Sequence, residues 1–409
     1  MTFDVARVRA DFPILSREVN GHPLVYLDSA NTSQKPRQVL EVMREHNERH
    51  NGNVSRSVHT LGTEATSAYE DARGKIATFI GATNPDEIIF TKNSTEAINL
   101  VAHSLGQHLS LKPGDEVVIS EMEHHSNIVP WQLLCERTGA TLRWFGVTDD
   151  GRLDESSLDE LVNERTKIVS VVHMSNTLGT INDLSRIVER AKQVGALVML
   201  DASQSVPHLP VDVRTLGADF IAFTGHKMLG PTGIGVLWGR YDLLAEMPPF
   251  LAGGSMIETV TMARTTYAPP PARFEAGTPP IAEAIGLGAA VDYLNALGMD
   301  AVHQHEQDIT AYALKVLADV PYVRLFGPAT PEGRGGTLSF DVEGVHPHDV
   351  GQVLDALGVE VRVGHHCAKP VCARFGVPAM TRASFYLYTT TDEIDALARG
   401  LDQVRKVFA

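Results

Sequence analysis

Short apolar segments alternate with longer amphipathic segments through the first two thirds of the chain. The apolar segments predict buried strands; in order they are EIIFT (87–91), EVVIS (116–120), KIVSVVHMSN (167–176), ALVMLDAS (196–203), DFIAFT (219–224) and IGVLWG (234–239). Segments with helical spacing lie between them, such as STEAINLVAHSL (94–105) and LSRIVERAKQVG (184–195). This alternation predicts a mostly parallel sheet covered on both faces, with a ligand crevice at the carboxyl ends of its strands.

The pattern changes after about residue 298, where the segments of a smaller unit follow. They are AYALKVLADV (311–320), TLSFDV (337–342), VEVRVG (359–364) and TDEIDALARGLDQVRKVF (391–408), an order typical of an α+β unit. The proline-rich stretch YAPPPARFEAGTPP (267–280) is too stiff for a core element and predicts a surface excursion. We therefore expect an N-terminal segment (residues 1–20) packed on the small domain, a large domain (21–297) and a small C-terminal domain (298–409).

Composition and charge narrow the class of protein. With 43% apolar and 21% charged residues, the 409-residue chain has the make-up of an ordinary globular enzyme. No apolar run approaches the roughly 20 residues that a membrane helix needs, and the beginning of the chain does not resemble a secretory signal. We therefore expect a cytoplasmic protein with no membrane partner. The formal net charge of -15 argues against a nucleic-acid partner.

Polar residues directly follow several of the apolar segments. They are His124, Asn176, Asp201, Gln204, Thr224, His226 and Lys227. Because the carboxyl ends of parallel strands meet at one edge of a sheet, we expect these side chains to surround one site. The set matches the demands of pyridoxal phosphate, which needs a lysine to hold it as a Schiff base and a carboxylate to keep its pyridine nitrogen protonated. Lys227 and Asp201 can fill these two roles.

Two neighbouring features have a simpler alternative. The segment NSTEAINL offers Asn93, Ser94 and Thr95 to a phosphate at a helix start, but Asn93 and Glu96 also have the spacing of a capping box. His124 can stack on an aromatic ring, or it can be a buried histidine held by hydrogen bonds. The pattern leaves these alternatives open.

Two histidine pairs suggest a metal site, His124–His125 and His365–His366. Zinc sites usually add a third protein ligand and often a local spacing such as H-E-x-x-H, and neither is visible here. We therefore expect no metal.

The three cysteines differ in their surroundings. Their odd number and unpatterned positions predict no disulfide framework and a reducing compartment. Cys135 lies in an apolar helical pattern and is expected to be buried. Cys367 lies between RVGHH and AKP, surroundings that favour a nucleophilic thiolate, although a loop cysteine without a role would look the same. Cys372 is either a resolving thiol or, as we expect, a bystander.

The motifs together resemble the SufS-type cysteine desulfurases, members of the class V aminotransferase family. They are YLDSANTSQKP (26–36), NVSRSVHTLG (53–62), TKNSTEAINLVA (91–102), EMEHHSNIVPWQ (121–132), HMSNTLGT (173–180), LDASQS (200–205), TGHKMLGPTGIG (224–235), RFEAGTPP (273–280), RVGHHCAKP (362–370) and TRASFYLYTT (381–390). They follow the family's order over nearly the whole chain, and RVGHHCAKP resembles the signature of the SufS-like group. The resemblance implies the α/β fold of PLP-dependent transferases (fold type I), with a mostly parallel seven-stranded sheet in the large domain and a smaller α+β C-terminal domain.

The resemblance also implies a role for each matching residue. Lys227 would form the Schiff base, Asp201 would face the pyridine nitrogen, Gln204 the ring hydroxyl, and His124 would stack on the ring. The phosphate would be held by Ser94, Thr95, Thr224 and His226, joined by Thr278 of the other subunit of a homodimer. Asn176, Arg362 and Arg382 would bind the substrate, and Cys367 would take its sulfur. Lys227, Cys367 and His124 would be the catalytic residues.

The implied reaction converts L-cysteine to L-alanine and leaves a persulfide on Cys367. A SufE-like or SufU-like acceptor protein would collect the sulfur for iron-sulfur cluster assembly. The alternatives are a selenocysteine lyase or another PLP-dependent β-elimination enzyme, a scaffold without catalysis, and a thiol peroxidase that uses Cys367 and Cys372. The chain departs from many relatives at Ser55, where they carry histidine, and at Thr389, where asparagine is common.

Overall fold

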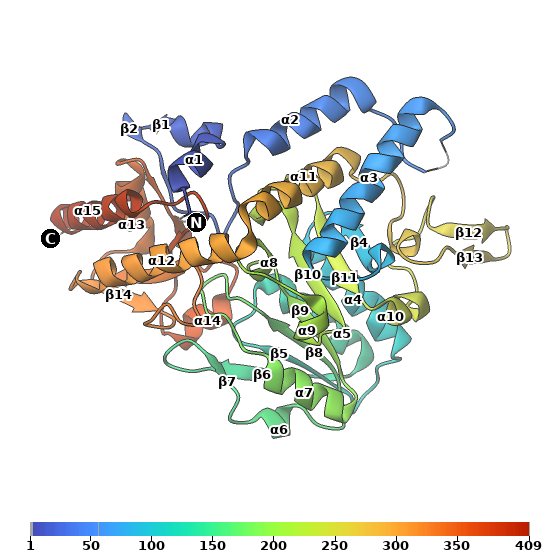
Figure 1. Cartoon of the computed structure of the whole chain (residues 1–409). Coiled ribbons are helices and arrows are strands. Elements are labelled where there is room, and N and C mark those ends of the chain that lie inside the picture. Colours follow the sequence, from blue (N-terminus) through green and yellow to red (C-terminus); the bar gives the residue numbers. More distant parts are fainter. Residues whose placement is uncertain (1–2, 56, 409) are drawn as a thin grey trace.

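The computed structural model describes residues 3–55 and 57–408 (Figure 1). Its largest sheet has eight strands in the order β4 (Ile88–Thr91), β11 (Gly235–Gly239), β10 (Phe220–Thr224), β9 (Leu197–Asp201), β8 (Thr166–Val172), β5 (Glu116–Ser120), β6 (Thr141–Val147) and β7 (Leu153–Asp154). The five strands from β10 to β6 are parallel, whereas β11 runs antiparallel to both of its neighbours. The expected number of strands, seven, is one too low. The sheet has an additional edge strand, β7, which is two residues long and pairs antiparallel with β6.

Both faces of this sheet are covered, as the uninterrupted apolar segments predicted. Along β10, Ile221 and Phe223 belong to one apolar cluster, and Phe220 and Ala222 belong to another. This division follows from the strand geometry, in which successive side chains point to opposite faces. The first cluster includes residues of α3 (Thr60–Phe79), α7 (Ser185–Val194) and α11 (Ile281–Leu297); the second includes residues of α4 (Ser94–His108), α5 (Val129–Thr138) and α10 (Tyr241–Glu246).

The C-terminal part of the chain forms a second, antiparallel sheet. Its strand order is β14 (Val323–Phe326), β15 (Thr337–Val342), β18 (Met380–Ser384) and β17 (Arg362–Gly364). Helices α12 (Met299–Ala318), α13 (Pro347–Asp355) and α15 (Thr391–Phe408) share one apolar cluster with it. The expected strand at 359–364 is divided in two, because Val359–Glu360 (β16) leaves this sheet and pairs with β3 (Val25–Tyr26).

The first residues contact both parts of the molecule. Arg9 of α1 (Val5–Ala10) forms an ion pair of 2.9 Å with Glu393 of α15. The Phe12 ring packs edge-on against Tyr293 of α11 and against Tyr388. The division at residues 20 and 297 stays a prediction.

The remaining elements are short or peripheral. They are η1 (Pro13–Ser16), β1 (Glu18–Val19), β2 (His22–Pro23), α2 (Arg37–Glu45), η2 (His46–His50), η3 (Pro85–Glu87), η4 (His125–Asn127), α6 (Leu158–Leu161), α8 (Ser205–His208), α9 (Val213–Leu216), η5 (Gly225–Lys227), β12 (Ile257–Val260), β13 (Thr265–Tyr267), η6 (Ala272–Phe274) and α14 (Lys369–Arg374). Strands β12 and β13 form a hairpin that projects from the body of the molecule (Figure 1). Among the described residues, no helix combines the length and the apolar character needed to cross a membrane.

Candidate active site

Lys227 lies directly beyond strand β10, at the carboxyl edge of the parallel strands. It is the last residue of the turn η5, and Asp201 is the last residue of the neighbouring strand β9. Burial lowers the pKa of Lys227 to about 8, and the carboxylate of Asp201 opposes that shift. A buried amine that loses its proton near neutral pH can act as a base and as a nucleophile.

Asp201 and Gln204 are held by the backbone around them. The Oδ1 atom of Asp201 accepts a hydrogen bond of 3.0 Å from the Ser203 amide, and the Gln204 side chain donates to the Ala30 carbonyl over 2.7 Å. Both residues are buried. The predicted pair of an acid and an amide at the end of β9 is therefore present in fixed orientations.

His124 presents a neutral ring. Burial, followed by the charge of Lys227, lowers the pKa of His124 to about 4. Its Nδ1 atom accepts from the Ser126 amide over 3.1 Å, which leaves the proton of the neutral ring on Nε2. The two interpretations of His124 are thus compatible, because a hydrogen-bonded ring beside Lys227 and Asp201 can also stack on a cofactor.

Several buried polar atoms at this edge have no hydrogen-bond partner among the described residues. They are Asn176 Oδ1, Ser203 Oγ, Gln204 Oε1 and Arg382 Nε. Buried polar groups in native proteins are nearly always satisfied. Acceptors, a hydroxyl and a guanidinium donor left open beside a half-buried lysine fit a polar, anionic, aromatic ligand such as pyridoxal phosphate.

The start of helix α4 lies beside the ends of β10 and β11. Asn93 caps the helix by accepting from the Glu96 amide over 2.9 Å, so the capping interpretation is correct. Thr224 pairs with Gly235 across the two strands, and a side chain added at Gly235 would lie 2.4 Å from the Asn93 backbone. The glycine therefore allows the helix start to approach Thr224, an arrangement that also suits a phosphate.

The other expected phosphate ligands differ in exposure. Ser94 and Thr224 are buried, whereas Thr95 and Thr278 are exposed. Burial, then the charges of Lys227 and Lys35, lowers the pKa of His226 to about 4. Thr278 lines a surface pocket together with Lys92 and Glu96 of the same chain. Its contribution to a second subunit stays a prediction.

Arg382 lies on β18, opposite Arg362 of β17. Arg382 is 3% exposed; its Nη1 donates to the Asn176 carbonyl over 2.9 Å, and its Nη2 contacts Asp28 over 3.3 Å. The Asn176 side chain in turn donates to the His366 carbonyl over 2.7 Å. The Arg362 side chain is half exposed and lies 4.0 Å from Asp28. Of the two arginines, only Arg382 is enclosed.

Cys367 is an exposed residue in the turn between β17 and α14, where its neighbours His366 and Ala368 are buried. His366 and Cys367 both have positive φ, 50° and 53°, a conformation that costs energy in residues other than glycine. The Cys367 carbonyl accepts from the His125 amide over 2.7 Å, which fastens the turn to η4. The charge of Cys367 also contributes to the pKa shifts of Lys227 and Arg382, so the thiol belongs to the same electrostatic neighbourhood.

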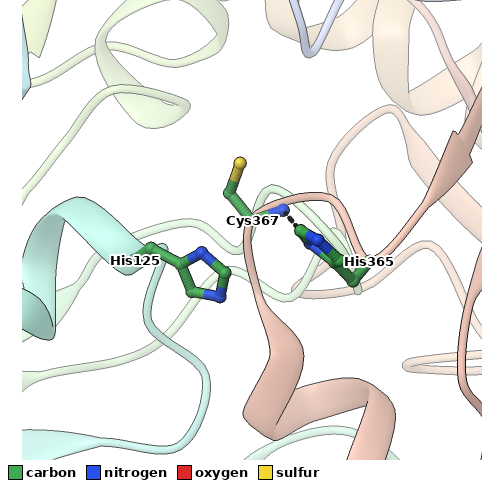
Figure 2. Close-up of side chains that lie close together, drawn as sticks. All are labelled: His125, His365 and Cys367. Carbon is green, nitrogen blue, oxygen red and sulfur yellow. Dashed lines mark hydrogen bonds between the residues drawn. The ribbon is translucent and has the colours of Figure 1, made fainter.

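The histidine pairs are not isolated in the structure. His125, His365 and Cys367 each present one ligand-type atom, and these three atoms lie within 4.8 Å of one another (Figure 2). The expectation of no metal depended on the lack of a third ligand along the chain, and that reason does not hold in three dimensions.

The other thiols are buried. Cys135 lies in the core, as expected, and burial raises its pKa to about 11. Cys372 is also buried, on α14, and burial raises its pKa as well. A buried thiol with a raised pKa is a poor resolving thiol.

Three residues beside the site were not singled out from the sequence. Asp28 contacts Arg382, and the Lys35 ammonium contacts the His226 carbonyl over 3.1 Å. Glu123, next to His124 in the chain, is buried and accepts from the Asn127 side chain and from the Val172 amide. All three lie in quoted motifs, YLDSANTSQKP and EMEHHSNIVPWQ, so their position in those motifs was the available signal.

The two departures from the family pattern lie in different surroundings. The Thr389 hydroxyl is buried and accepts from the Tyr386 amide over 3.0 Å, so threonine has a structural function there. Ser55 is exposed, with φ of 61°.

Comparisons with known proteins agree with this geometry. The family model described as aminotransferase class-V matches residues 25–397. A protein of Streptomyces coelicolor named probable cysteine desulfurase is 62% identical over 99% of this chain and 98% of its own length. A cysteine desulfurase of Dickeya dadantii is 51% identical over 99% of this chain and 98% of its own. The solved apo structure of a cysteine desulfurase from Thermococcus onnurineus NA1 has a TM-score of 0.93 and 39% identity, covering 98% of both chains.

Proposed function

The chain belongs to the class-V aminotransferase family, where its full-length relatives are cysteine desulfurases, and we propose from this that it converts L-cysteine to L-alanine and takes the sulfur on Cys367. One observation carries the proposal. A half-buried lysine, Lys227, lies beside Asp201 and Arg382 and within electrostatic reach of an exposed cysteine. This combination provides a base, an anion-binding group and a sulfur acceptor in one place.

Pyridoxal 5'-phosphate, when bound, supplies an electron-poor ring that takes up negative charge from the substrate. Lys227 would hold its aldehyde carbon and Asp201 its pyridine nitrogen, with Gln204 at the ring hydroxyl and His124 against the ring. Its phosphate would lie at the start of α4, where Ser94, Thr95, Thr224 and His226 offer hydroxyl and ring groups. The unsatisfied Gln204 Oε1 and Ser203 Oγ support this arrangement.

Lys227 is suited to moving the substrate's Cα proton. Its pKa, lowered to about 8 by burial, leaves the Nζ atom ready both to accept a proton and to return it near neutral pH. A lysine in water stays protonated until about pH 10.4 and would be a poor base. The low-dielectric position beyond β10 therefore creates the base.

Arg382 and Asn176 would bind the substrate carboxylate. The guanidinium is planar and can donate two parallel hydrogen bonds to a carboxylate. Its Nε atom is unsatisfied, and one of its other nitrogens contacts Asp28, which a carboxylate ligand can replace as partner. The half-exposed Arg362 would contribute from the rim.

The sulfur transfer balances without an external oxidant. The thiol of Cys367 and L-cysteine give a Cys367 persulfide and L-alanine, with the same atoms and electrons on both sides. The substrate's Cβ gains the electron pair and the proton that the two sulfur atoms lose.

The exposed position of Cys367 supports hand-over to a second protein. A SufE-like or SufU-like acceptor would collect the sulfur for iron-sulfur cluster assembly, and the motif RVGHHCAKP supports assignment to the SufS-type group. The enzyme would work in the cytoplasm as a homodimer in which Thr278 of one subunit completes the phosphate site of the other.

Mass spectrometry after incubation with L-cysteine tests the proposal. We expect one added sulfur atom on the peptide that contains Cys367, with alanine formed, and no such adduct in Cys367→Ala. Cys372→Ala is the matched control and should keep the adduct, because its thiol is buried. Alanine formation without an adduct on Cys367 would exclude this route. Loss of Cys367→Ala activity on cysteine, with activity on selenocysteine retained, would show that the thiol is needed only for sulfur.

A further inference from the structure

The strongest unassigned feature is the cluster of His125, His365 and Cys367. His125 begins η4, whereas His365 and Cys367 belong to the turn between β17 and α14. The two rings have their centroids 5.5 Å apart, and Figure 2 shows them on either side of the Cys367 backbone, with the sulfur projecting away from the turn. The composition of the cluster suits a metal, but it also suits an anionic sulfur that needs hydrogen-bond donors.

Hydrogen bonds to the two rings decide between these possibilities. The Lys369 amide donates to His125 Nε2 over 3.1 Å, and the Cys367 amide donates to His365 Nδ1 over 3.2 Å. A backbone amide can only donate, so each accepting nitrogen carries the lone pair of a neutral ring. The proton of each ring is therefore on the other nitrogen, His125 Nδ1 and His365 Nε2.

A metal site would need the opposite arrangement of lone pairs and protons on the two rings. A ligating nitrogen must present a lone pair, and here both lone pairs already face backbone amides of the turn. Within the described residues, no hydrogen bond uses His125 Nδ1 or His365 Nε2. Two free N–H groups beside a thiol complement a negative charge.

We propose that His125 and His365 are further catalytic residues, whose free N–H groups donate to the sulfur anion at Cys367. The proposal rests on the proposed function. Cys367 first releases its thiol proton to solvent, and its thiolate then forms the S–S bond. The electron pair of the substrate's Cβ–S bond goes to Cβ, which takes up the proton of the substrate's own thiol as alanine forms. The terminal sulfur keeps the negative charge, and the two N–H groups stabilise it before and after the transfer.

The exposed turn allows these contacts to shorten. One nitrogen of each ring and the Cys367 sulfur lie within 4.8 Å of one another, and hydrogen bonds at catalytic sites are often long before substrate binds. Cys367 is exposed, so its side chain can rotate toward the rings without displacing core residues.

Alkylation of the holoenzyme by iodoacetamide, without L-cysteine, measures the thiolate directly. We expect His125→Ala and His365→Ala each to slow alkylation of the Cys367 peptide at pH 7 by about fivefold, the effect of one hydrogen bond to a charged group at a partly exposed site. Cys135 and Cys372 are buried and serve as unreactive internal references. His22→Ala removes an exposed histidine of β2 and should leave the rate unchanged.

Amide replacements test which ring nitrogen donates. The side-chain amide in His125→Asn takes the place of Nδ1, and that in His365→Gln takes the place of Nε2, so both should alkylate within about twofold of wild type. The exchanged variants, His125→Gln and His365→Asn, place the amide elsewhere and should stay as slow as the alanine variants. If the two histidines had only a structural role, the matched and the exchanged amide variants would not differ in their alkylation rates.

Three outcomes would overturn the proposal: alanine variants at the wild-type rate, matched amides as slow as alanine, or exchanged amides that restore the rate equally well. Purified holoenzyme that retains one zinc ion per chain through Cys367, His125 and His365 would also overturn it, in favour of a metal site. Because alkylation needs no L-cysteine, the predicted pattern without any persulfide would refute the proposed function alone.

Discussion

Lys227 and Cys367 belong to one electrostatic neighbourhood but are held in opposite ways. Lys227 follows a strand that is buried at every residue, and its own partial burial lowers its pKa to about 8. Cys367 is exposed, on a turn where two consecutive residues have positive φ. A proton-transferring group gains from a low dielectric, whereas a group that passes sulfur to another protein must remain accessible. The positive φ angles of the turn cost energy, and they belong to the conformation in which the thiol is accessible.

We expect the largest effect on activity from substitution of Lys227. Lys227→Ala should lower the rate of alanine formation by about 10^3-fold or more, because it removes the base and the cofactor's anchor. The apoprotein should melt no earlier than wild type, since burial of an amine is unfavourable. Lys315→Ala, on an exposed position of α12, is the control and should keep full activity. Substantial turnover by Lys227→Ala would disprove the role of this lysine.

The pH dependence of Lys227 comes next in size. Burial lowers the pKa of Lys227 to about 8, so the neutral amine predominates above pH 8 and declines about tenfold for each pH unit below it. Labelling of the apoprotein by pyridoxal phosphate and borohydride, counted on the Lys227 peptide, should therefore rise up to about pH 8 and then level off. A curve that still climbs above pH 10 would show an ordinary solvated lysine.

The two arginines sharpen the comparison between the enclosed site and its rim. Arg382→Lys should lower kcat/KM for L-cysteine by about 10- to 100-fold, because a buried guanidinium loses its paired hydrogen bonds. Arg362→Lys, at the half-exposed position across the strand pair, should cost about threefold or less. Steady-state alanine formation measures both. Equal effects would mean that enclosure does not determine carboxylate binding.

Substitution of two glycines by alanine should be destabilising for different reasons. Gly235→Ala places a methyl group 2.4 Å from the Asn93 backbone and should destabilise the fold by about 1–3 kcal/mol, with weaker retention of cofactor. Gly364→Ala meets no atom within 4 Å, but its φ of 123° costs a non-glycine residue about 1–2 kcal/mol. Urea unfolding and cofactor retention separate them. If only Gly364→Ala lost the cofactor, the assignment of Gly235 to the phosphate site would be contradicted.

The smallest effect concerns Cys367 itself. With φ of 53°, Cys367→Gly should be more stable than Cys367→Ala by about 1 kcal/mol, because glycine adopts this conformation without a steric penalty. Urea unfolding of the two inactive variants measures the difference. Equal stabilities would mean that the turn stores no strain at this residue.

The sequence predicted most of the large sheet, and its failures have physical causes. The six apolar segments correspond to β4, β5, β8, β9, β10 and β11, which are buried along nearly their whole length. Strand β6 was not recognised from its pattern, because five of its seven residues, Thr141 to Trp144 and Gly146, are exposed or half-buried. Segment 359–364 read as one strand, although its two halves pair with different partners.

The residues of the site also fall into two groups, those that could be placed together from the sequence and those that could not. Lys227, Asp201, Gln204 and Asn176 could be placed together from sequence, because parallel strands bring their carboxyl ends to one edge. The exposure of Thr95 and Thr278, and the position of Asp28 beside Arg382, could not. These depend on packing between segments that are distant along the chain.

By itself, the sequence determined which chemical groups follow the buried strands, and therefore the site's base, acid and amide. Local hydrophobic pattern is enough for this, since it sets where a strand ends and which residue comes next. Only the tertiary structure decided the surroundings of Cys367. His125 and the turn around Lys369, 244 residues apart, meet there, and backbone amides of the turn set which nitrogen of each ring carries the proton. Proton positions depend on contacts across the fold, which no local pattern contains.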